Sequence, residues 1–271
     1  MGGTDVGLVD ATAPPASAAR RIAFTVCTVI FGLAAAGALG FGLVIGWFDN
    51  EDGGIHRVHL LGFGILFGVL VAAPLLAMAR RPERRPSAFL QVAVAALAGL
   101  AATALAAGSG YLAFAVAEVA IVGVLLALHP DRRGVLHPVA RPSVPMGVVA
   151  LAGSVPLVAV GLTYARLQRI GPPSDPHVSQ DHWVNMAAMV FAIALVALFA
   201  SARVRGWLLS AWCAGIALAL YGIASVVFAR FPGSDVPYPG SVGTGWGIAA
   251  VVGGLGFIAL AEWEARRSRR A

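Results

Sequence analysis

Four of the six histidines stand just before or at the start of two apolar segments, with a spacing suited to metal or haem ligation. His56 and His59 are three residues apart, so a helix places both on one face. His182 begins another apolar segment, and Asn185 and Met186 follow it at helical spacing. Imidazole with thioether suits copper, imidazole with carboxylate suits zinc, and two facing imidazoles suit haem iron. We predict haem or metal ligands at His59 and His182, with His56 and Met186 as further metal ligands.

Two carboxylates are candidates for acid–base chemistry. Glu118 lies seven residues into an apolar segment, about 10 Å deep at 1.5 Å of rise per residue. An ionisable side chain is costly at that depth, which favours a proton relay, an ion site or a substrate contact. Asp181 directly precedes His182 and is our second candidate for a catalytic acid. The plainer alternatives are a protonated, locally hydrogen-bonded Glu118 and an Asp181 that caps free backbone N–H groups.

The other candidate site residues also have plain alternatives. Histidines at helix starts often face water, and Met186 could simply fill core space. Arg166 stands near the predicted outer end of an apolar segment, where it could reach phospholipid headgroups or contact an anionic substrate. We predict Arg166 and Asn185 as substrate contacts.

The composition is typical of a membrane protein. The chain is 59% hydrophobic and 12% charged, whereas soluble domains carry about 25% charged residues. Apolar stretches of about 20 residues recur, which is the length that crosses a hydrocarbon core of about 30 Å. We therefore predict an all-α integral membrane protein with eight transmembrane helices, at 22–48, 55–79, 88–107, 111–128, 145–165, 182–202, 206–229 and 242–262.

The distribution of charge predicts the orientation in the membrane. The chain has no Lys, and fifteen of its 19 Arg residues occur in every second segment between the apolar stretches. Such an excess marks the cytoplasmic side, so we expect both termini in the cytoplasm and the four histidines outside. The Ala- and Arg-rich composition suggests a bacterial plasma membrane. The sequence pI is near 10.3. Arg residues at the helix ends account for this charge by their attraction to anionic lipid headgroups, so we do not expect a nucleic-acid partner.

A weak internal repeat predicts the domain organisation. A shift of 123 positions places His59 on His182 and Arg80 on Arg203. Parallel duplications of this kind occur in membrane proteins, although chance identities among apolar helices are the alternative. We predict two similar four-helix halves, 20–142 and 143–265. A disordered cytoplasmic tail at 1–19 and a basic cytoplasmic tail at 266–271 flank them.

Several classes of protein are excluded by missing residues. Without Lys there is no retinal Schiff base. No P-loop, GxSxG or helical HExxH pattern is present. Cys27 and Cys213 fall within predicted helices without CxxC spacing, so we expect small apolar packing residues there.

A family resemblance is carried by the segment 55–62, IHRVHLLG. It resembles the His-Arg motif on the second helix of the haem A synthase family. That family has two four-helix halves, a cytoplasmic N-terminus and outward-side histidines on the second and sixth helices, so the resemblance implies haem at that side. The chain departs from the family by a Gly at the acidic position before the motif. It also has no His at the outer ends of the fourth and eighth helices, so we do not expect a bis-histidine haem in each half.

Three functional hypotheses remain open from the sequence. In the first, His59 and His182 bind haem or a transition metal, copper or zinc, for redox chemistry or metal handling. In the second, the chain is a proton-coupled carrier or lipid permease in which Glu118 carries the proton and Arg166 contacts an anionic group. In the third, it is an intramembrane enzyme acting on an isoprenoid or lipid, with Glu118 or Asp181 as general acid. The sequence leaves enzymatic activity and oligomeric state undecided.

Overall fold

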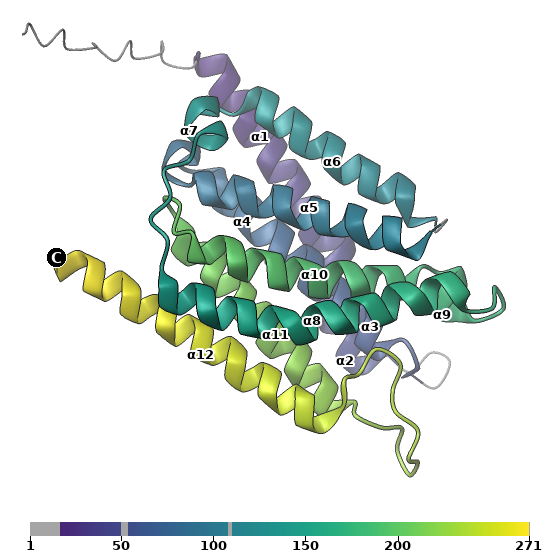
Figure 1. Cartoon of the computed structure of the whole chain (residues 1–271). Coiled ribbons are helices and arrows are strands. Elements are labelled where there is room, and N and C mark those ends of the chain that lie inside the picture. The colour runs from purple at the N-terminus through teal and green to yellow at the C-terminus, as the bar shows by residue number, and fades with distance from the viewer. Residues whose placement is uncertain (1–16, 50–53, 108–109, 271) are drawn as a thin grey trace, which may run out of the picture.

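The described part of the chain is a bundle of helices without β-strands (Figure 1). The computed structural model describes residues 17–49, 54–107 and 110–270. Among these residues, eight helical segments are long and apolar enough to cross a membrane, which confirms the predicted all-α membrane fold. The predicted tail falls largely on residues 1–16, which lie outside the described residues, and its last two residues already belong to the first helix.

The eight segments match the predicted spans to within a few residues at most ends. The fifth and eighth are longer than predicted and continue as helix past the apolar stretch, the eighth through the basic residues after 265. The segments are α1–η1–α2 (Ala18–Ala34, Ala35–Leu39, Gly42–Phe48), α3–η3–α4 (Arg57–Gly64, Ile65–Ala72, Ala73–Met78), α5 (Pro86–Ala106), α6 (Tyr111–Leu128), α8 (Val144–Ile170), α10 (His182–Ser201), α11 (Trp207–Val227) and α12 (Gly243–Arg270). Short helices η4 (Pro82–Arg84), α7 (Arg132–Leu136) and α9 (Pro176–Ser179) lie in connections.

The bundle has two chemically different ends. One end, which we call the arginine end, holds the described arginines of 20–21, 80–85, 132–141, 203–205 and 266–269. The other, which we call the histidine end, holds the four histidines of 56–59 and 177–182. The start of α1 and the end of α12 lie on the same side of the bundle (Figure 1). Contacts join the segments of the arginine end: Arg21 to Glu83, Arg205 to Asp131, Arg203 to Glu264, and Arg20 to the carbonyl of His129.

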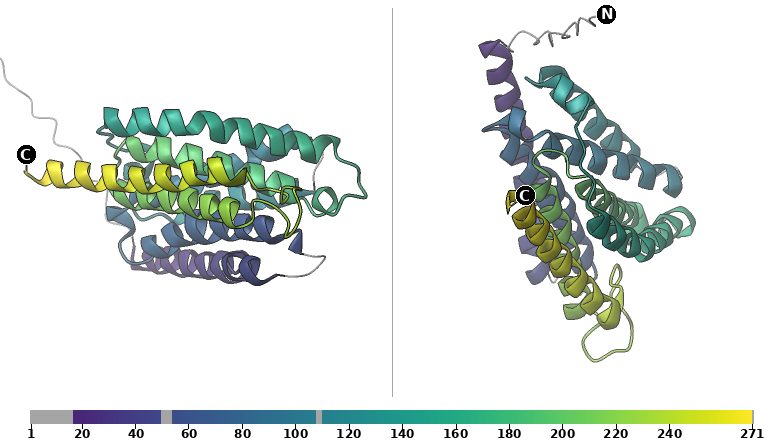
Figure 2. Two further views of the ribbon diagram at one scale, coloured as in Figure 1. Left: turned by 90° about the horizontal axis from the view of Figure 1, so that it is seen from below. Right: turned by 60° about the vertical axis from the view of Figure 1, so that its left-hand side comes forward.

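Four segments lie inside the bundle and four lie outside (Figure 2). The inner segments are α3–η3–α4, α5, α10 and α11, and α10 is buried without interruption from His182 to Ala194. In chain order the pattern is outer, inner, inner, outer, and then the same again. That order is what two four-helix units of one layout would produce, and the division into halves stays a prediction.

The second segment changes helix type before a proline. η3 is a π-helix, and Pro74 follows it in the first turn of α4. Proline has no N–H to donate to the carbonyl four residues earlier, which belongs to Leu70. The side chain of Gln91 on α5 donates to this carbonyl at 3.0 Å. A buried amide thus satisfies the acceptor that the proline cannot, as a break in a membrane helix requires.

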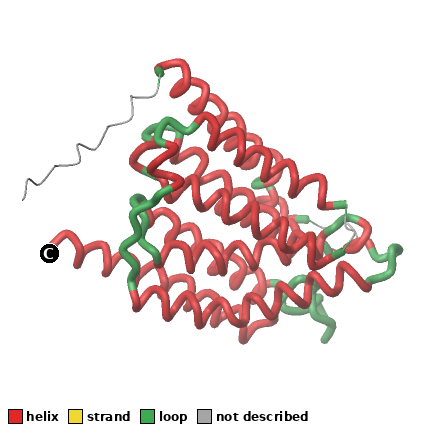
Figure 3. The backbone as a smooth tube through the Cα atoms, turned by 45° about the horizontal axis from the view of Figure 1, so that its top comes forward, coloured by secondary structure: helices red, strands yellow, loops and turns green. Residues whose placement is uncertain are grey.

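Loops at the two ends connect roughly parallel helices (Figure 3). At the histidine end, residues 228–242 link α11 to α12, and Gly240 in this loop has φ +82°. A Cβ at Gly240 would lie 3.5 Å from the ring of His59 and 3.3 Å from the methyl group of Met186. The loop therefore covers His59. Glycine suits position 240 because it tolerates the positive φ and lets the loop backbone approach the ring closely.

Candidate functional site

The structure gathers four histidines at one end of the bundle. We call His56, His59, His177 and His182 the four-histidine cluster. His56 immediately precedes α3 and His59 lies in its first turn, whereas His177 belongs to α9 and His182 begins α10. All four are buried. The predicted grouping of His56, His59 and His182 is therefore present in space, and His177 joins it.

The imidazole rings are in mutual contact. His56 Nδ1 lies 3.1 Å from His182 Nδ1, so one of these nitrogens donates to the other. His59 and His182 are nearly stacked, with 26° between their planes. The ring centres are separated by 4.7 Å (His56–His182), 4.8 Å (His59–His177), 5.0 Å (His56–His177), 5.1 Å (His59–His182) and 5.9 Å (His177–His182).

A short helical turn orients His177. Asp175 caps α9 by accepting the backbone N–H of His177 at 2.9 Å, and Pro176 occupies the first turn. The same carboxylate oxygen lies 2.9 Å from His177 Nδ1. Desolvation of Asp175 opposes its ionisation, but the hydrogen bonds from His177 outweigh it and lower the pKa of Asp175. A carboxylate paired with Nδ1–H leaves Nε2 of His177 as a lone-pair donor towards the cluster.

Some buried nitrogens of the cluster have no hydrogen-bond partner. Within the described residues, both ring nitrogens of His59 and Nε2 of His177 are buried and unpaired. The side chain of His59 is fully buried. One turn along α10, the amide of Asn185 is also fully buried, and neither its oxygen nor its nitrogen has a partner among the described residues. Since buried polar atoms are almost always paired, these atoms call for a water or a ligand.

On α10, the side that follows His182 at helical spacing and carries Met186 faces α3. The sulfur of Met186 packs so closely on Gly62 that a Cβ at this position would collide with it. The sulfur of Met189 lies 3.5 Å from the same Cβ position. Gly62 is one turn after His59, so two thioethers lie one helical turn below the four-histidine cluster.

Aromatic residues form one wall of the site. The ring of Trp183 lies 4.9 Å from that of His59 and 5.5 Å from that of Tyr164. The hydroxyl of Tyr164 donates to the carbonyl of Gly240 at 2.6 Å and lies 2.7 Å from the hydroxyl of Tyr221. The tyrosine pair therefore fixes the loop that covers His59.

Asp181 connects helices rather than facing the rings. It has φ +57° and accepts hydrogen bonds from the backbone N–H groups of Gly110 and Tyr111 at the start of α6. The side chain of Gln168 on α8 also donates to it, at 3.2 Å. Burial raises the pKa of Asp181, and the two backbone hydrogen bonds oppose that rise. This is the capping role that the sequence left open as the plainer alternative.

Glu118 and Arg166 lie apart from the cluster. Glu118 is on α6 against α5, where a Cβ at Gly99 would lie 3.0 Å from its carboxylate oxygen. Figure 1 shows α5 between α6 and α10. Arg166 is exposed on α8, on a different face from the buried Gln168. The structure therefore gives the two residues no shared site with the histidines.

Neither His177 nor Asp175 is among the site residues that we predict from the sequence. The signal was available in Asp175-Pro176-His177, since Asp followed by Pro is a typical helix start. Such a turn places the next side chains beside the following helix. Trp183 and the two tyrosines had no comparable signal, because aromatic residues near helix ends fit the membrane interface equally well.

Comparisons with other proteins give no family for the chain. No protein-family model, no curated protein sequence and no solved structure matches it. Within the described residues, no group of three or more His, Cys, Asp or Glu side chains has its donor atoms arranged as a metal site. The chemistry of the site is therefore argued from its own residues.

Proposed function

We propose that this multi-pass membrane protein binds one transition-metal ion, copper by preference, in the four-histidine cluster. The observation that carries the proposal is the fully buried imidazole of His59, whose two nitrogens both lack a partner among the described residues. Leaving a buried polar group unpaired is costly, and the cost for one of the two nitrogens is removed when its lone pair coordinates an ion. Neutral imidazole is the commonest protein ligand for such ions.

The spacing of the rings supports a shared ion. Nitrogens at about 2.1 Å from one tetrahedral ion hold imidazole ring centres about 5 Å apart. Four of the ring pairs in the cluster are separated by 4.7–5.1 Å. The donor atoms of the described residues do not form a metal site in the present ring orientations, although the ring centres have the spacing that one ion requires. Rotation about the side-chain χ2 angles redirects the nitrogens without moving the helices.

The surroundings of the cluster support the same proposal. Asp175 binds Nδ1 of His177, which is the carboxylate–histidine pair that orients metal-binding imidazoles in many proteins. Met186 and Met189 add thioethers one turn away, and thioether sulfur favours copper over zinc. Asn185 adds a buried amide beside them that has no partner in the part of the chain that the structure describes.

Haem is supported less well than a single ion by this packing. Two axial imidazoles must stand on opposite faces of a flat macrocycle. The rings of His59 and His182 instead stack directly on each other at 5.1 Å. A haem between them would require the two helices to separate.

The arginine distribution supports placing the metal centre at the outer side of the membrane. The arginine end corresponds to the cytoplasmic side by the usual rule for basic residues. A centre at the opposite end is suited to receiving metal from outside or to exchanging electrons there. The carrier and lipid-enzyme hypotheses depend on Glu118 and Asp181. Within the described residues, no contact of these two carboxylates favours either hypothesis over metal binding.

The test is the metal content of the purified protein. Protein loaded with Cu²⁺ or Zn²⁺ and then dialysed should retain about one ion per chain. His59→Ala and His177→Ala should each lose it. His137→Ala, which changes an exposed histidine at the arginine end, should retain it. Substoichiometric copper and zinc in the wild type would overturn the proposal, and a Soret band in place of metal would replace the ion by haem.

A further inference from the structure

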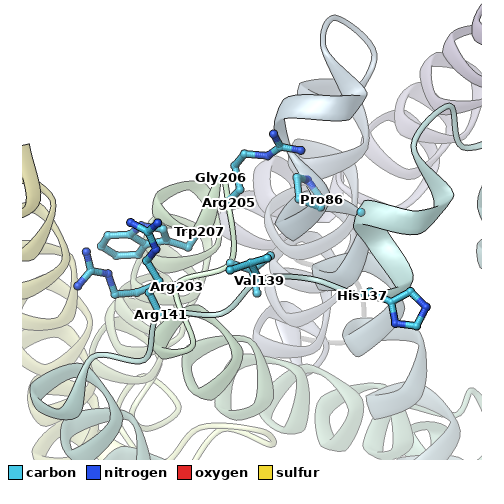
Figure 4. A pocket seen from close by; sticks show the side chains of 10 residues that line it. Pro86, His137, Val139, Arg141, Arg203, Arg205, Gly206 and Trp207 are labelled. Carbon is cyan, nitrogen blue, oxygen red and sulfur yellow. The ribbon is translucent and has the colours of Figure 1, made fainter. Parts of the chain in front are cut away.

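We propose that a basic pocket at the arginine end binds the phosphate headgroup of an anionic membrane lipid. The pocket is independent of the four-histidine cluster and lies at the opposite end of the bundle. It has a volume of about 660 Å³. Its polar lining comes from Arg141, Arg203, Arg205 and His137, with Trp207 beside them (Figure 4). We call it the arginine pocket.

The backbone holds the arginine pocket in shape. The turn between α10 and α11 places Arg203 at φ +54° and Gly206 at φ +89°. The N–H of Arg141 donates to the carbonyl of Ala202 at 2.9 Å, which fastens the segment before α8 to the end of α10. The N–H of Ser87 on α5 donates to the carbonyl of Arg205 at 3.3 Å. The pocket is therefore a junction of α5, α7, α10 and α11 with ordered walls.

Carboxylates compensate only part of the positive charge. Arg203 pairs with Glu264 at 3.0 Å, and its guanidinium lies 5.1 Å from the ring centre of Trp207. Arg205 lies 3.6 Å from Asp131 in a largely exposed pair. Within the described residues Arg141 forms no ion pair. Figure 4 shows Arg141 and Arg203 together beside Trp207.

This arrangement suits a phosphate. Arginine presents a fork of N–H donors that matches phosphate oxygens. The contacts of Arg203 with Glu264 and Trp207 hold one guanidinium in place, so less side-chain entropy is lost when a ligand binds. Among the described residues no carboxylate pairs with Arg141, which makes this charge the main contributor to anion affinity. Basic pockets between membrane helices on the cytoplasmic side commonly take lipid headgroups.

The neighbouring surface favours a lipid over a soluble phosphate. Apolar side chains on both sides of Arg141 in the sequence are widely exposed: Leu136 at 57%, Val139 at 77% and Val144 at 76%. Val139 also lines the pocket. A soluble phosphate makes no use of these side chains, whereas the acyl chains of a lipid bury them. Trp207 stands at the start of α11, and tryptophans at the ends of membrane helices commonly lie where headgroups meet the hydrocarbon.

The test compares lipid retention by the purified, full-length protein in native mass spectrometry. Wild-type protein should retain dioleoyl phosphatidylglycerol in preference to dioleoyl phosphatidylcholine. Arg141→Gln combined with Arg205→Gln should weaken this preference about tenfold, since two of the three arginines that line the pocket are removed. Arg203 is left unchanged because its pair with Glu264 is largely buried, whereas the pair of Arg205 with Asp131 is more exposed and longer. Arg266→Gln, which removes an exposed charge at the same end outside the pocket, should retain the preference.

Each result supports or overturns the proposal. Arg141→Gln alone, at an exposed side chain, should weaken the preference in the same direction and guards against misfolding of the double variant. Equal loss in Arg266→Gln would mean that general charge at this end attracts the lipid, and it would overturn a specific pocket. Displacement of the lipid by equimolar inorganic phosphate would identify a soluble anion as the ligand. Unchanged retention in the double variant would also overturn the proposal.

Discussion

At the residue scale, the histidine end is organised by a few polar side chains with distinct tasks. Asp175 fixes the tautomer of His177, and Asp181 caps α6 from the start of α10. The two carboxylates are six residues apart, and their environments shift the pKa of Asp175 down and that of Asp181 up. Two aspartates at helix starts therefore have different roles, and the residue type alone does not determine which. The role follows from which backbone and ring N–H groups each carboxylate accepts.

Asp175→Asn should weaken metal binding without removing it. The amide keeps the size of the side chain and can still accept the backbone N–H of His177, but it loses the charge that orients the ring. Loss of such an outer partner typically lowers metal affinity about 10–100-fold. Competition with a chelator of known affinity measures the change.

The control for Asp175→Asn is a carboxylate at the same end of the bundle. Asp235 lies in the loop between α11 and α12 with its side chain 97% exposed and pairs with Arg230. Asp235→Asn should leave metal affinity unchanged. Equal affinities for wild type and Asp175→Asn would separate His177 from the proposed centre.

At the element scale, the outer helix α12 depends on glycine for its packing against the inner helix α11. α11 and α12 approach so closely that a Cβ at Gly222 would lie 2.5 Å from the carbonyl oxygen of Gly247. A Cβ at Gly254 would collide with the carbonyl of Gly215. In lipid no hydrophobic effect drives helices together, so close backbone contact supplies the dispersion energy.

Gly254→Ala should therefore destabilise the bundle. The added methyl meets backbone, which cannot move as a side chain can, and overpacking of this kind costs about 1–3 kcal/mol. Gly256→Ala is the matched control, because open space surrounds that position on the same helix. Thermal unfolding in detergent should show a lower midpoint for Gly254→Ala only. Equal midpoints for the two variants would contradict the packing of α11 on α12.

The sequence predicted the helices better than it predicted their partners. Apolar length fixes a span because the hydrocarbon thickness is fixed, which is why the span at Tyr111–Leu128 was predicted residue for residue. Helix ends beyond the apolar run were missed at α8 and α12, since backbone hydrogen bonding continues through polar residues such as Arg169. The close pairing of α11 with α12 needs specific glycines to face each other, and hydropathy carries no such information.

At the scale of the whole molecule, charge and histidine separate to opposite ends. The prediction that His56, His59 and His182 share one end followed from the alternation of basic segments. The alternation could not indicate that their rings touch, because contact depends on how α3, α9 and α10 pack. Glu118 shows that depth along a helix does not indicate which other helices lie beside it. Its depth along α6 suits a shared cavity with the histidines, but α5 lies between α6 and α10 (Figure 1).

The same separation predicts the orientation in the membrane. Arginines near helix ends resist translocation, so the arginine end should face the cytoplasm and the histidine end should face outward. Cysteine labelling can decide this after Cys27 and Cys213 are replaced by Ala. Ser234→Cys introduces an exposed thiol at the histidine end, and Ala140→Cys introduces one at the arginine end. A membrane-impermeant maleimide should label Ser234→Cys in intact spheroplasts and Ala140→Cys only after permeabilisation. The reverse pattern would place the four-histidine cluster on the cytoplasmic side, where its metal would have to come from inside the cell.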